Sequence, residues 1–205
     1  MPFIKTEKIK SGLIGFWEIA ENDDFNLANS IFKSYHPNCL NYKSEYRKKQ
    51  ILATRLLANQ MCPEENIFQD SFGKPHFKSK EKYLSISNDQ DIVVLYISNQ
   101  PCGIDIQTLN KKISVISHKF LNRNDFAKNH NENELIHLWC AKEAMYKIYG
   151  TPKILFKKHL TIFKTKEDSK LRGESSKPNF LFNCIINNMK FKNYYLVYTS
   201  DFKEL

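Results

Sequence analysis

The sequence of 205 residues is poor in glycine, proline and long apolar runs, and each shortage excludes a class of protein. Only 6 glycines and 7 prolines are present, too few for a collagen-like or low-complexity chain. The longest apolar runs, such as residues 92–97, are far shorter than the roughly 20 residues that a membrane-spanning helix needs. The glycines are scattered, so the glycine-rich phosphate loop of P-loop and dinucleotide-binding enzymes is absent from the sequence.

The chain also lacks the cysteine and leader patterns of secreted proteins. Its five cysteines are odd in number and widely spaced, at positions 39, 62, 102, 140 and 184. Without a CxxC pair, neither a disulfide framework nor a zinc knuckle is expected. Charged residues at positions 5, 7, 8 and 10 interrupt the N-terminal segment, which argues against a signal peptide. We therefore expect a reduced, cytoplasmic protein with no membrane partner.

What the chain does contain is enough apolar material for a core, together with a net charge of +9. Hydrophobic residues make up 41% and aromatic residues 13%, which is too apolar for a disordered chain. Residues 1–103 carry 13 Lys and Arg against 12 Asp and Glu, whereas residues 104–205 carry 18 against 10. A basic half indicates an anionic partner: a nucleic acid, a phosphorylated cofactor or an acidic protein. A solvent-facing lysine surface would give the same balance.

Strands and helices are mixed in both halves, in an order typical of an α+β fold. Apolar and aromatic patterning predicts strands at residues 13–20, 83–88, 92–98, 103–107, 160–163, 180–186 and 194–199. The first strand ends in an acidic turn at 21–24. The strands at 83–88 and 92–98 should pair as a hairpin.

Apolar periodicity predicts two helices, at residues 45–61 and 134–149. Gly150 and then Pro152 end the second helix in the usual order. Residues 164–177 are rich in Lys and Ser, and they predict a mobile basic loop.

A short motif in the strand predicted at 103–107 places a carboxylate in apolar surroundings. Alternation along the strand sends Ile104 and Ile106 to the core and leaves Asp105 and Gln107 side by side on the opposite face. An unpaired carboxylate between apolar residues is unfavourable. Asp105 therefore needs a cation or a hydrogen-bond partner.

The helix predicted at 134–149 supplies candidate partners. Trp139, Glu143 and Lys147 follow at i, i+4 and i+8 and share one face. A carboxylate with a lysine one turn later can hold a hard cation beside a phosphate. An exposed Glu–Lys pair would have the same spacing, but it explains neither Trp139 above it nor the adjacent Lys142.

Taken together, these motifs resemble the 4′-phosphopantetheinyl transferase superfamily, in its longer, two-lobed, surfactin-type branch. The resemblance rests on four stretches in order: Gly73-Lys74-Pro75, Ser85-Ile86-Ser87, Gly103-Ile104-Asp105-Ile106, and Trp139-Cys140-Ala141-Lys142-Glu143-Ala144 with Lys147. It covers residues 73–150, and the helix at 45–61 fits more loosely.

The family implies two similar α+β lobes related by a pseudo-twofold axis, with the active site in the cleft between them. We expect residues 1–103 to form the N-terminal lobe and residues 104–205 to form the C-terminal lobe with the metal and the catalytic helix. The implied activity is transfer of 4′-phosphopantetheine from coenzyme A to a serine of an apo acyl or peptidyl carrier protein, with release of 3′,5′-ADP. Such carriers are acidic, which suits a basic surface. No nucleic acid is implied, and a chain that completes its own cleft can be a monomer.

Carried over by position, the resemblance also implies residue roles. Asp105, Gln107 and Glu143 would bind Mg²⁺, or Mn²⁺ in its place. With Asp105, the implied catalytic residues are Glu143, which takes the proton from the incoming serine, and Lys147, which steadies the phosphates. The residues implied for binding coenzyme A are Arg47, Lys48, Lys74, Ser87, Asn88, Lys142 and Lys147.

Two positions depart from the family pattern. The family's Ser-His-Ser stretch aligns with Ser87-Asn88-Asp89, and Asn88 cannot become cationic. The family's Asp-Ile-Glu ends here in Gln107, which removes one formal charge from the metal site. Both changes predict weaker binding of coenzyme A or metal.

These departures leave a second hypothesis open: a non-catalytic protein of the same fold that binds coenzyme A or a carrier protein. A third hypothesis, a small basic nucleic-acid-binding protein, predicts affinity that falls steeply with salt and needs no divalent metal. It leaves Asp105 and Glu143 unexplained, and we rank it last.

Overall fold

The computed structural model describes residues 3–20, 43–108, 113–125, 131–151, 153–167 and 170–205. The acidic turn predicted at 21–24, Cys39 and Pro152 lie outside these ranges. Helices and antiparallel sheets make up the described chain, which confirms the mixed α and β class. Within these ranges, every helix is too short or too polar to cross a membrane.

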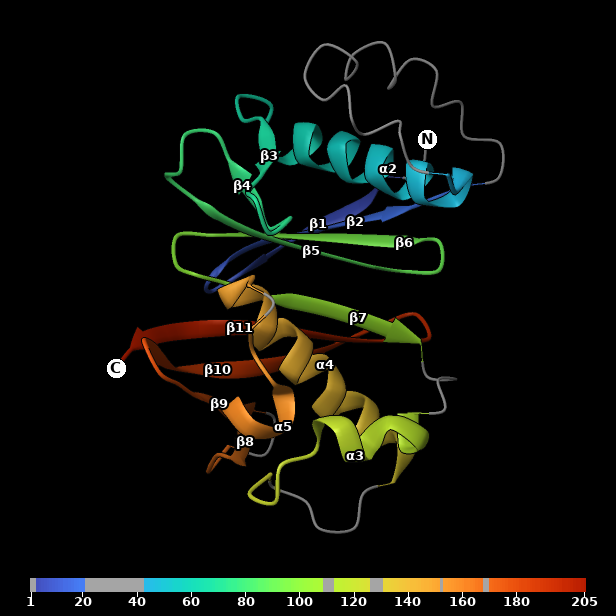
Figure 1. Ribbon diagram of the computed structural model, residues 1–205. Coiled ribbons are helices and arrows are strands. Elements are labelled where there is room, and N and C mark those ends of the chain that lie inside the picture. Colours follow the sequence, from blue (N-terminus) through green and yellow to red (C-terminus); the bar gives the residue numbers. More distant parts are fainter. Residues whose placement is uncertain (1–2, 21–42, 109–112, 126–130, 152, 168–169) are drawn as a thin grey trace.

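The first sheet comes from the N-terminal half of the chain. Its antiparallel strands lie in the order β1 (Phe3–Ile9), β2 (Gly12–Glu18), β6 (Ile92–Ser98) and β5 (Tyr83–Asp89). The helix α2 (Glu45–Met61) covers one face of this sheet (Figure 1). A short antiparallel pair, β3 (Ile67–Gln69) and β4 (Pro75–Phe77), lies between α2 and β5 in the chain. The predicted hairpin of β5 and β6 is confirmed.

The second sheet comes from the C-terminal half and is also antiparallel. Its strands lie in the order β7 (Ile104–Thr108), β11 (Tyr194–Glu204), β10 (Phe180–Phe191), β9 (Lys170–Lys177) and β8 (Leu160–Lys164). The helix α4 (Glu132–Tyr149) covers the face that points away from the first sheet (Figure 1). Three short helices lie near α4: η2 (Ile113–Ile116), α3 (Ser117–Phe120) and α5 (Phe156–His159).

Three apolar cores hold these layers together. Residues of β6 alternate between a core against α2 and a core against the second sheet. Ile104 and Ile106 of β7 join the core between the sheets, as strand alternation predicted. A third core lies between the second sheet and α4. Because β6 is covered on both faces, all seven of its residues are buried, and its sequence is an almost unbroken apolar run.

The helix α4 begins at Glu132, two residues before the predicted start, and ends at Tyr149 as predicted. Asn131 and Glu134 form a capping box, in which each side chain accepts a hydrogen bond from the other residue's backbone N–H. Such a cap contributes about 1 kcal/mol to helix stability. Gly150 ends the helix in the left-handed conformation, with φ of 74°. The positions of these two ends determine which residues of α4 lie beside β7.

The mobile loop predicted over 164–177 is wrong for residues 170–177, which form β9 between β8 and β10. Small and apolar side chains occupy the buried positions of this strand. A Cβ atom at Gly173 would lie 2.5 Å from Met145 Sδ of α4. Gly173, which suggested a loop, therefore makes room for the helix.

Candidate active site

Asp105 lies on β7, and its side chain is almost fully buried, with the residue 3% exposed. Its Oδ1 atom accepts hydrogen bonds from Ser87 Oγ and from Lys147 Nζ, both at 2.8 Å. Its Oδ2 atom accepts a longer hydrogen bond, 3.3 Å, from Gln107 Nε2. The expectation that this carboxylate has a cation or a hydrogen-bond partner is confirmed, because it has both.

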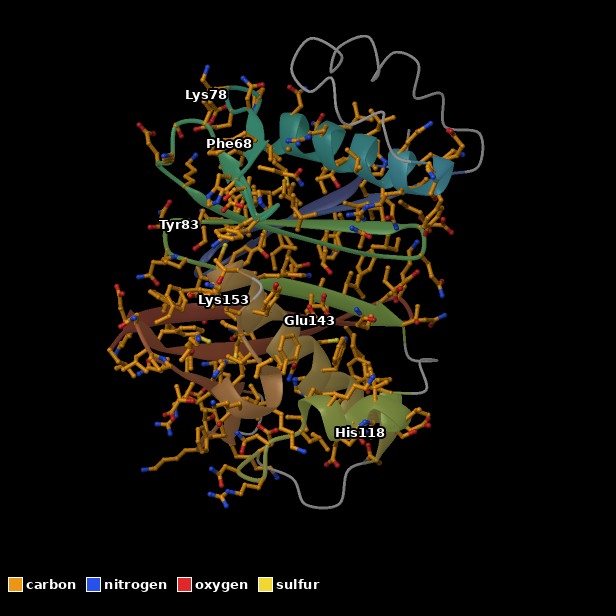
Figure 2. All side chains as sticks on the ribbon, viewed as in Figure 1. Phe68, Lys78, Tyr83, His118, Glu143 and Lys153 are labelled. Carbon is orange, nitrogen blue, oxygen red and sulfur yellow. The ribbon has the colours of Figure 1, made fainter. Side chains whose placement is uncertain are left out.

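Lys147 and Glu143 bring α4 to the same site. Besides its ion pair with Asp105, Lys147 Nζ donates to the backbone oxygen of Ile104 at 2.8 Å. Glu143 lies one turn earlier and is half-buried, and Figure 2 shows it on α4 beside β7. The helix therefore presents one cation and one carboxylate close to the strand that carries Asp105.

Two other residues on this part of α4 are packed and unreactive. The ring of Trp139 contacts that of Phe120 edge-on, with centroids 5.2 Å apart. Cys140 is buried, and burial together with the negative charge of Asp105 raises the pKa of its thiol well above the usual value. The raised pKa disfavours the thiolate, which makes Cys140 a poor nucleophile.

A pocket of about 270 Å³ opens beside Lys147, where α2, the β3–β4 turn, β5 and the end of α4 meet. Its polar lining residues are Arg47, Gln50, Thr54, Arg55, Gln69, Lys74, Ser85, Asn88, Tyr146 and Lys147. Among the described residues that line it, four are cationic and none is acidic. The pocket is therefore suited to a ligand with several negative charges.

The arginines of the pocket are held in place by neighbouring groups. Arg47 Nη1 donates to Gln50 Oε1 at 3.0 Å and to Asn88 Oδ1 at 3.3 Å. Arg55 Nη1 donates to the backbone oxygen of Ile67 at 2.7 Å. Asn88 therefore orients a cation, although its own side chain cannot carry a positive charge.

Lys74 reaches from the β3–β4 turn to the C-terminal end of α4. Its Nζ donates to the backbone oxygen of Ile148, where the negative end of the helix dipole favours a cation. Its stem packs so closely on Gly150 that a Cβ atom there would lie 2.3 Å from Lys74 Cδ. Burial lowers the pKa of the Lys74 ammonium. An anion bound nearby would favour the charged form.

The structure places two of the predicted coenzyme A ligands away from this pocket. Lys142 is 0% exposed, and its Nζ contacts Asp125 Oδ2 at 2.6 Å and two backbone carbonyl oxygens at 2.9 and 3.0 Å. Because all three of its donors are used inside the protein, the phosphate contact predicted for Lys142 is corrected to a structural role. Lys48 pairs with Glu45 at 2.6 Å, outside the pocket lining.

Two further predicted residues belong to the surroundings of Asp105. Ser87 is buried and directs its hydroxyl at Asp105. Gln107 lies beside the same carboxylate on β7. Of the predicted set, the structure therefore brings Arg47, Lys74, Asn88 and Lys147 to the pocket, and Lys147 joins the pocket to Asp105.

Sequence reasoning missed Gln50 and Thr54 as pocket residues, and it connected Arg55 only with the helix at 45–61 that fits the family pattern loosely. Their helical spacing carried a signal, because Arg47 and Arg55 are two turns apart on α2. Gln50 and Thr54 are one turn apart on an adjoining stripe, and both are buried although polar. Buried polar residues on an otherwise apolar helix face indicate a site or a hydrogen-bond network.

The predicted metal ligands supply two carboxylates, Asp105 and Glu143, and the amide of Gln107. The described residues contain no group of three or more His, Cys, Asp or Glu that could hold a metal by themselves. Mg²⁺ commonly binds through one or two carboxylates, and waters and substrate phosphates complete its shell. The donor set therefore fits an ion shared with a phosphate of a ligand in the adjoining pocket.

A second hollow, of about 860 Å³, lies where the β1–β2 turn approaches the end of β11. Lysines contribute to its lining at positions 8, 10, 82 and 170. None of the predicted site residues belongs to the described lining of this hollow.

Part of the chain is similar to known proteins. Residues 101–195 match the family model of the 4′-phosphopantetheinyl transferase superfamily. A protein of Aneurinibacillus migulanus described as 4′-phosphopantetheinyl transferase gsp is 30% identical over 122 residues, which cover 54% of this chain and 51% of that protein. The matched part thus spans about half the length of this curated relative. Through residues 101–195, which hold Asp105, Glu143 and Lys147, the chain is similar to the 4′-phosphopantetheinyl transferase superfamily.

Proposed function

We propose that this protein transfers 4′-phosphopantetheine from coenzyme A to a serine of an apo acyl or peptidyl carrier protein and releases 3′,5′-ADP. The observation that carries the proposal is the position of Lys147. This residue lines the cationic pocket and also forms an ion pair with the buried Asp105 at 2.8 Å. A site for a polyphosphate ligand therefore adjoins the carboxylates at which the transfer takes place.

In this proposal the pocket binds the phosphates of coenzyme A. Arg47 and Arg55 line it from α2, Lys74 lines it from the β3–β4 turn, and Asn88 orients Arg47. Arginine suits this task because its planar guanidinium group donates two parallel hydrogen bonds to one phosphate. Lys147 places a further positive charge at the side of the pocket nearest to Asp105.

Asp105 and Glu143, with Gln107 beside them, would hold Mg²⁺ or Mn²⁺ together with the pyrophosphate of coenzyme A. The bound ion would offset negative charge on the pyrophosphate. Gln107 brings no formal charge, so the two carboxylates supply all the negative charge of the protein ligands.

The chemical step needs a base for the carrier serine and a stable position for the leaving group. Glu143 accepts the proton of the serine hydroxyl. The serine oxygen forms a bond to the β-phosphorus of coenzyme A as the bond from that phosphorus to 3′,5′-ADP breaks. Lys147 donates to the phosphate oxygens and stabilises the departing anion. The nucleophile belongs to the partner, which fits the protonated state of Cys140.

We also propose that the chain is divided into two lobes. Residues 1–103 and 104–205 would form two lobes related by a pseudo-twofold axis, with the site in the cleft between them. The pocket supports this arrangement, because α2 and β5 line one side and α4 lines the other. One chain supplies all of this lining, which favours a monomer. The net charge of +9 favours an acidic carrier protein as partner, in the cytoplasm.

The decisive experiment is intact-mass analysis of an apo acyl carrier protein incubated with this protein, coenzyme A and Mg²⁺. We expect a mass gain of one phosphopantetheine group that EDTA and Glu143→Ala abolish. Glu132→Ala, which changes a glutamate in the first turn of the same helix, should leave the gain intact. No gain with any of several carriers would reject the transferase.

A second candidate, a non-catalytic protein that binds coenzyme A or a carrier protein, is favoured by one observation. Gln107 replaces an acidic ligand and donates its amide to Asp105. This candidate predicts coenzyme A binding by calorimetry that Mg²⁺ does not strengthen, together with no mass gain. A binding site for nucleic acid would instead leave the Asp105–Lys147 pair without a function.

A further inference from the structure

Side chains of β5 join the edge of the first sheet to the edge of the second. The backbone N–H groups of Ile104, Ile106 and Thr108 on β7 each donate to a side chain on β5. Their acceptors are Ser85 Oγ at 3.1 Å, Ser87 Oγ at 3.3 Å and Asp89 Oδ2 at 2.6 Å. The donor residues and the acceptor residues are each two positions apart along their strands. The three hydrogen bonds, called rungs below, are therefore evenly spaced between the two edge strands.

The middle rung differs from the other two because it continues to Asp105. Ser87 Oγ accepts from the N–H of Ile106 and donates to Asp105 Oδ1 at 2.8 Å. A hydroxyl has a single proton, so accepting from Ile106 leaves that proton free to point at the carboxylate. The hydroxyl is buried, and water does not compete for it.

The two oxygens of Asp105 are therefore unequal. Oδ1 receives the strong donors, the hydroxyl of Ser87 and the ammonium group of Lys147, both at 2.8 Å. Two donors occupy the two lone pairs of one carboxylate oxygen. Oδ2 receives the neutral amide of Gln107 at 3.3 Å. The thiol of Cys140 also forms a hydrogen bond with this carboxylate, as a weak donor. A cation that approaches Asp105 therefore displaces weaker donors at Oδ2 than at Oδ1.

We infer that Ser87 is a positioning residue, which fixes the Asp105 carboxylate so that Oδ2 is its cation-binding oxygen. The inference rests on the proposed metal-dependent transfer and assigns Ser87 to Asp105 in place of the phosphate contact expected from the sequence. Groups that orient a metal ligand typically change metal affinity by about 10- to 100-fold when they are removed. Loss of the Ser87 hydroxyl lets the carboxylate rotate and weakens the metal.

Ser85 lines the pocket, and its substitution offers a matched control for Mn²⁺ binding measured without coenzyme A. Ser85→Ala and Ser87→Ala each remove one buried hydroxyl from β5 and leave one N–H of β7 without its acceptor. Only Ser87→Ala also takes a donor from Asp105. A purely structural role predicts similar effects of the two substitutions, whereas a positioning role predicts a difference confined to metal binding.

The experiment titrates Mn²⁺ into the purified full chain, with and without coenzyme A, and follows binding by water proton relaxation. Thermal melting of each variant is recorded in parallel. We expect Ser87→Ala to weaken Mn²⁺ binding by about 10-fold or more, with Ser85→Ala within twofold of the wild type and similar melting temperatures for both. Ser87→Thr, which keeps the hydroxyl, should recover most of the affinity and provides the test if Ser87→Ala does not fold.

Equal loss of Mn²⁺ affinity in the two alanine variants would overturn the inference, as would a Ser87→Thr variant no better than Ser87→Ala. A wild-type protein that binds no Mn²⁺ under either condition would also overturn it. Absence of transfer to a carrier protein tests the proposed reaction and not the role of Ser87. A selective effect of Ser87→Ala on Mn²⁺ binding, with no transfer to any carrier protein, would support the positioning role and reject the proposed reaction.

Discussion

Lys147 of α4 and Asp105 of β7 form an ion pair at 2.8 Å, and the ammonium group also donates to the backbone oxygen of Ile104. The side chain of Asp105 is 4% exposed and that of Lys147 is 23% exposed. Removing one partner of such a pair leaves a charge that is buried and uncompensated, which costs more than removing both.

Lys147→Met should therefore lower the free energy of unfolding by about 3 kcal/mol. Asp105→Asn combined with Lys147→Met should recover part of this loss, because no charge is left unpaired. Urea denaturation of the wild type, both single variants and the double variant gives the comparison. A double variant less stable than Lys147→Met would show that the pair is not the source of the effect. All three variants should lose transferase activity.

The buried Lys142 should matter for stability and not for coenzyme A binding. Lys142→Met leaves Asp125 charged and buried without its cation, and this should cost about 3 to 5 kcal/mol of stability. The remaining folded protein should bind coenzyme A with unchanged affinity, since Lys142 has no access to the pocket. Lys74→Met should do the reverse, with lower coenzyme A affinity and a smaller change in stability. Calorimetry at low temperature distinguishes the two, and a fall in affinity for Lys142→Met would return this lysine to the phosphate site.

The lowered pKa of Lys74 also predicts how the affinity for coenzyme A depends on pH. Burial lowers the pKa of this ammonium below its usual value, so Lys74 loses its charge at a lower pH than an exposed lysine does. A phosphate prefers the charged form, and affinity should therefore fall as the pH rises through the lowered pKa of Lys74. Arginine remains charged over this range, so Lys74→Arg should remove this decline. Calorimetry from neutral to alkaline pH gives both profiles. Identical slopes for the wild type and Lys74→Arg would contradict the assignment.

Gly150 should affect binding through Lys74. A Cβ atom at Gly150 would lie 2.3 Å from Lys74 Cδ, and φ at this position is +74°. Gly150→Ala should therefore destabilise the end of α4 by about 1 kcal/mol and also displace Lys74 from the pocket, with a measurable loss of coenzyme A affinity. In a Lys74→Ala background the side chain that is displaced is missing, so Gly150→Ala should have little further effect on affinity. If Gly150→Ala lowers coenzyme A affinity equally in the wild type and in Lys74→Ala, the cause lies in the backbone of α4 and not in Lys74.

Elements with clear periodicity could be predicted from the sequence. The apolar spacing of α2 and the capping and stop signals of α4 act locally, and each helix lies close to its expected residues. The run in β6 is apolar because both of its faces are covered. β1 was missed because charged residues occupy its length, as is common for strands at the edge of a sheet. β9 was missed because α4 packs against it and requires small residues there.

The sequence was enough to predict which types of residue form the site. It was not enough to predict which residues these side chains contact. Lys142 and Lys147 both lie on α4, and a family pattern alone suggests phosphate contacts for both. Only tertiary packing distinguishes them: Lys142 faces Asp125, and Lys147 faces Asp105. Ser87 shows the same limit, because its partner lies 18 residues away on another strand.

The apolar core between the two sheets restricts how the molecule can move. Ile104 and Ile106, next to Asp105 in the chain, are anchored in this core with residues of β2 and β6. Swinging the two sheets apart like a hinge would expose this apolar surface to water, at a cost of about 25 cal/mol for each Å² uncovered. In the proposed transferase, exchange of ligand and product would therefore depend on side chains and turns around the pocket, such as Phe72 and Lys74, while Asp105 stays in place between the sheets.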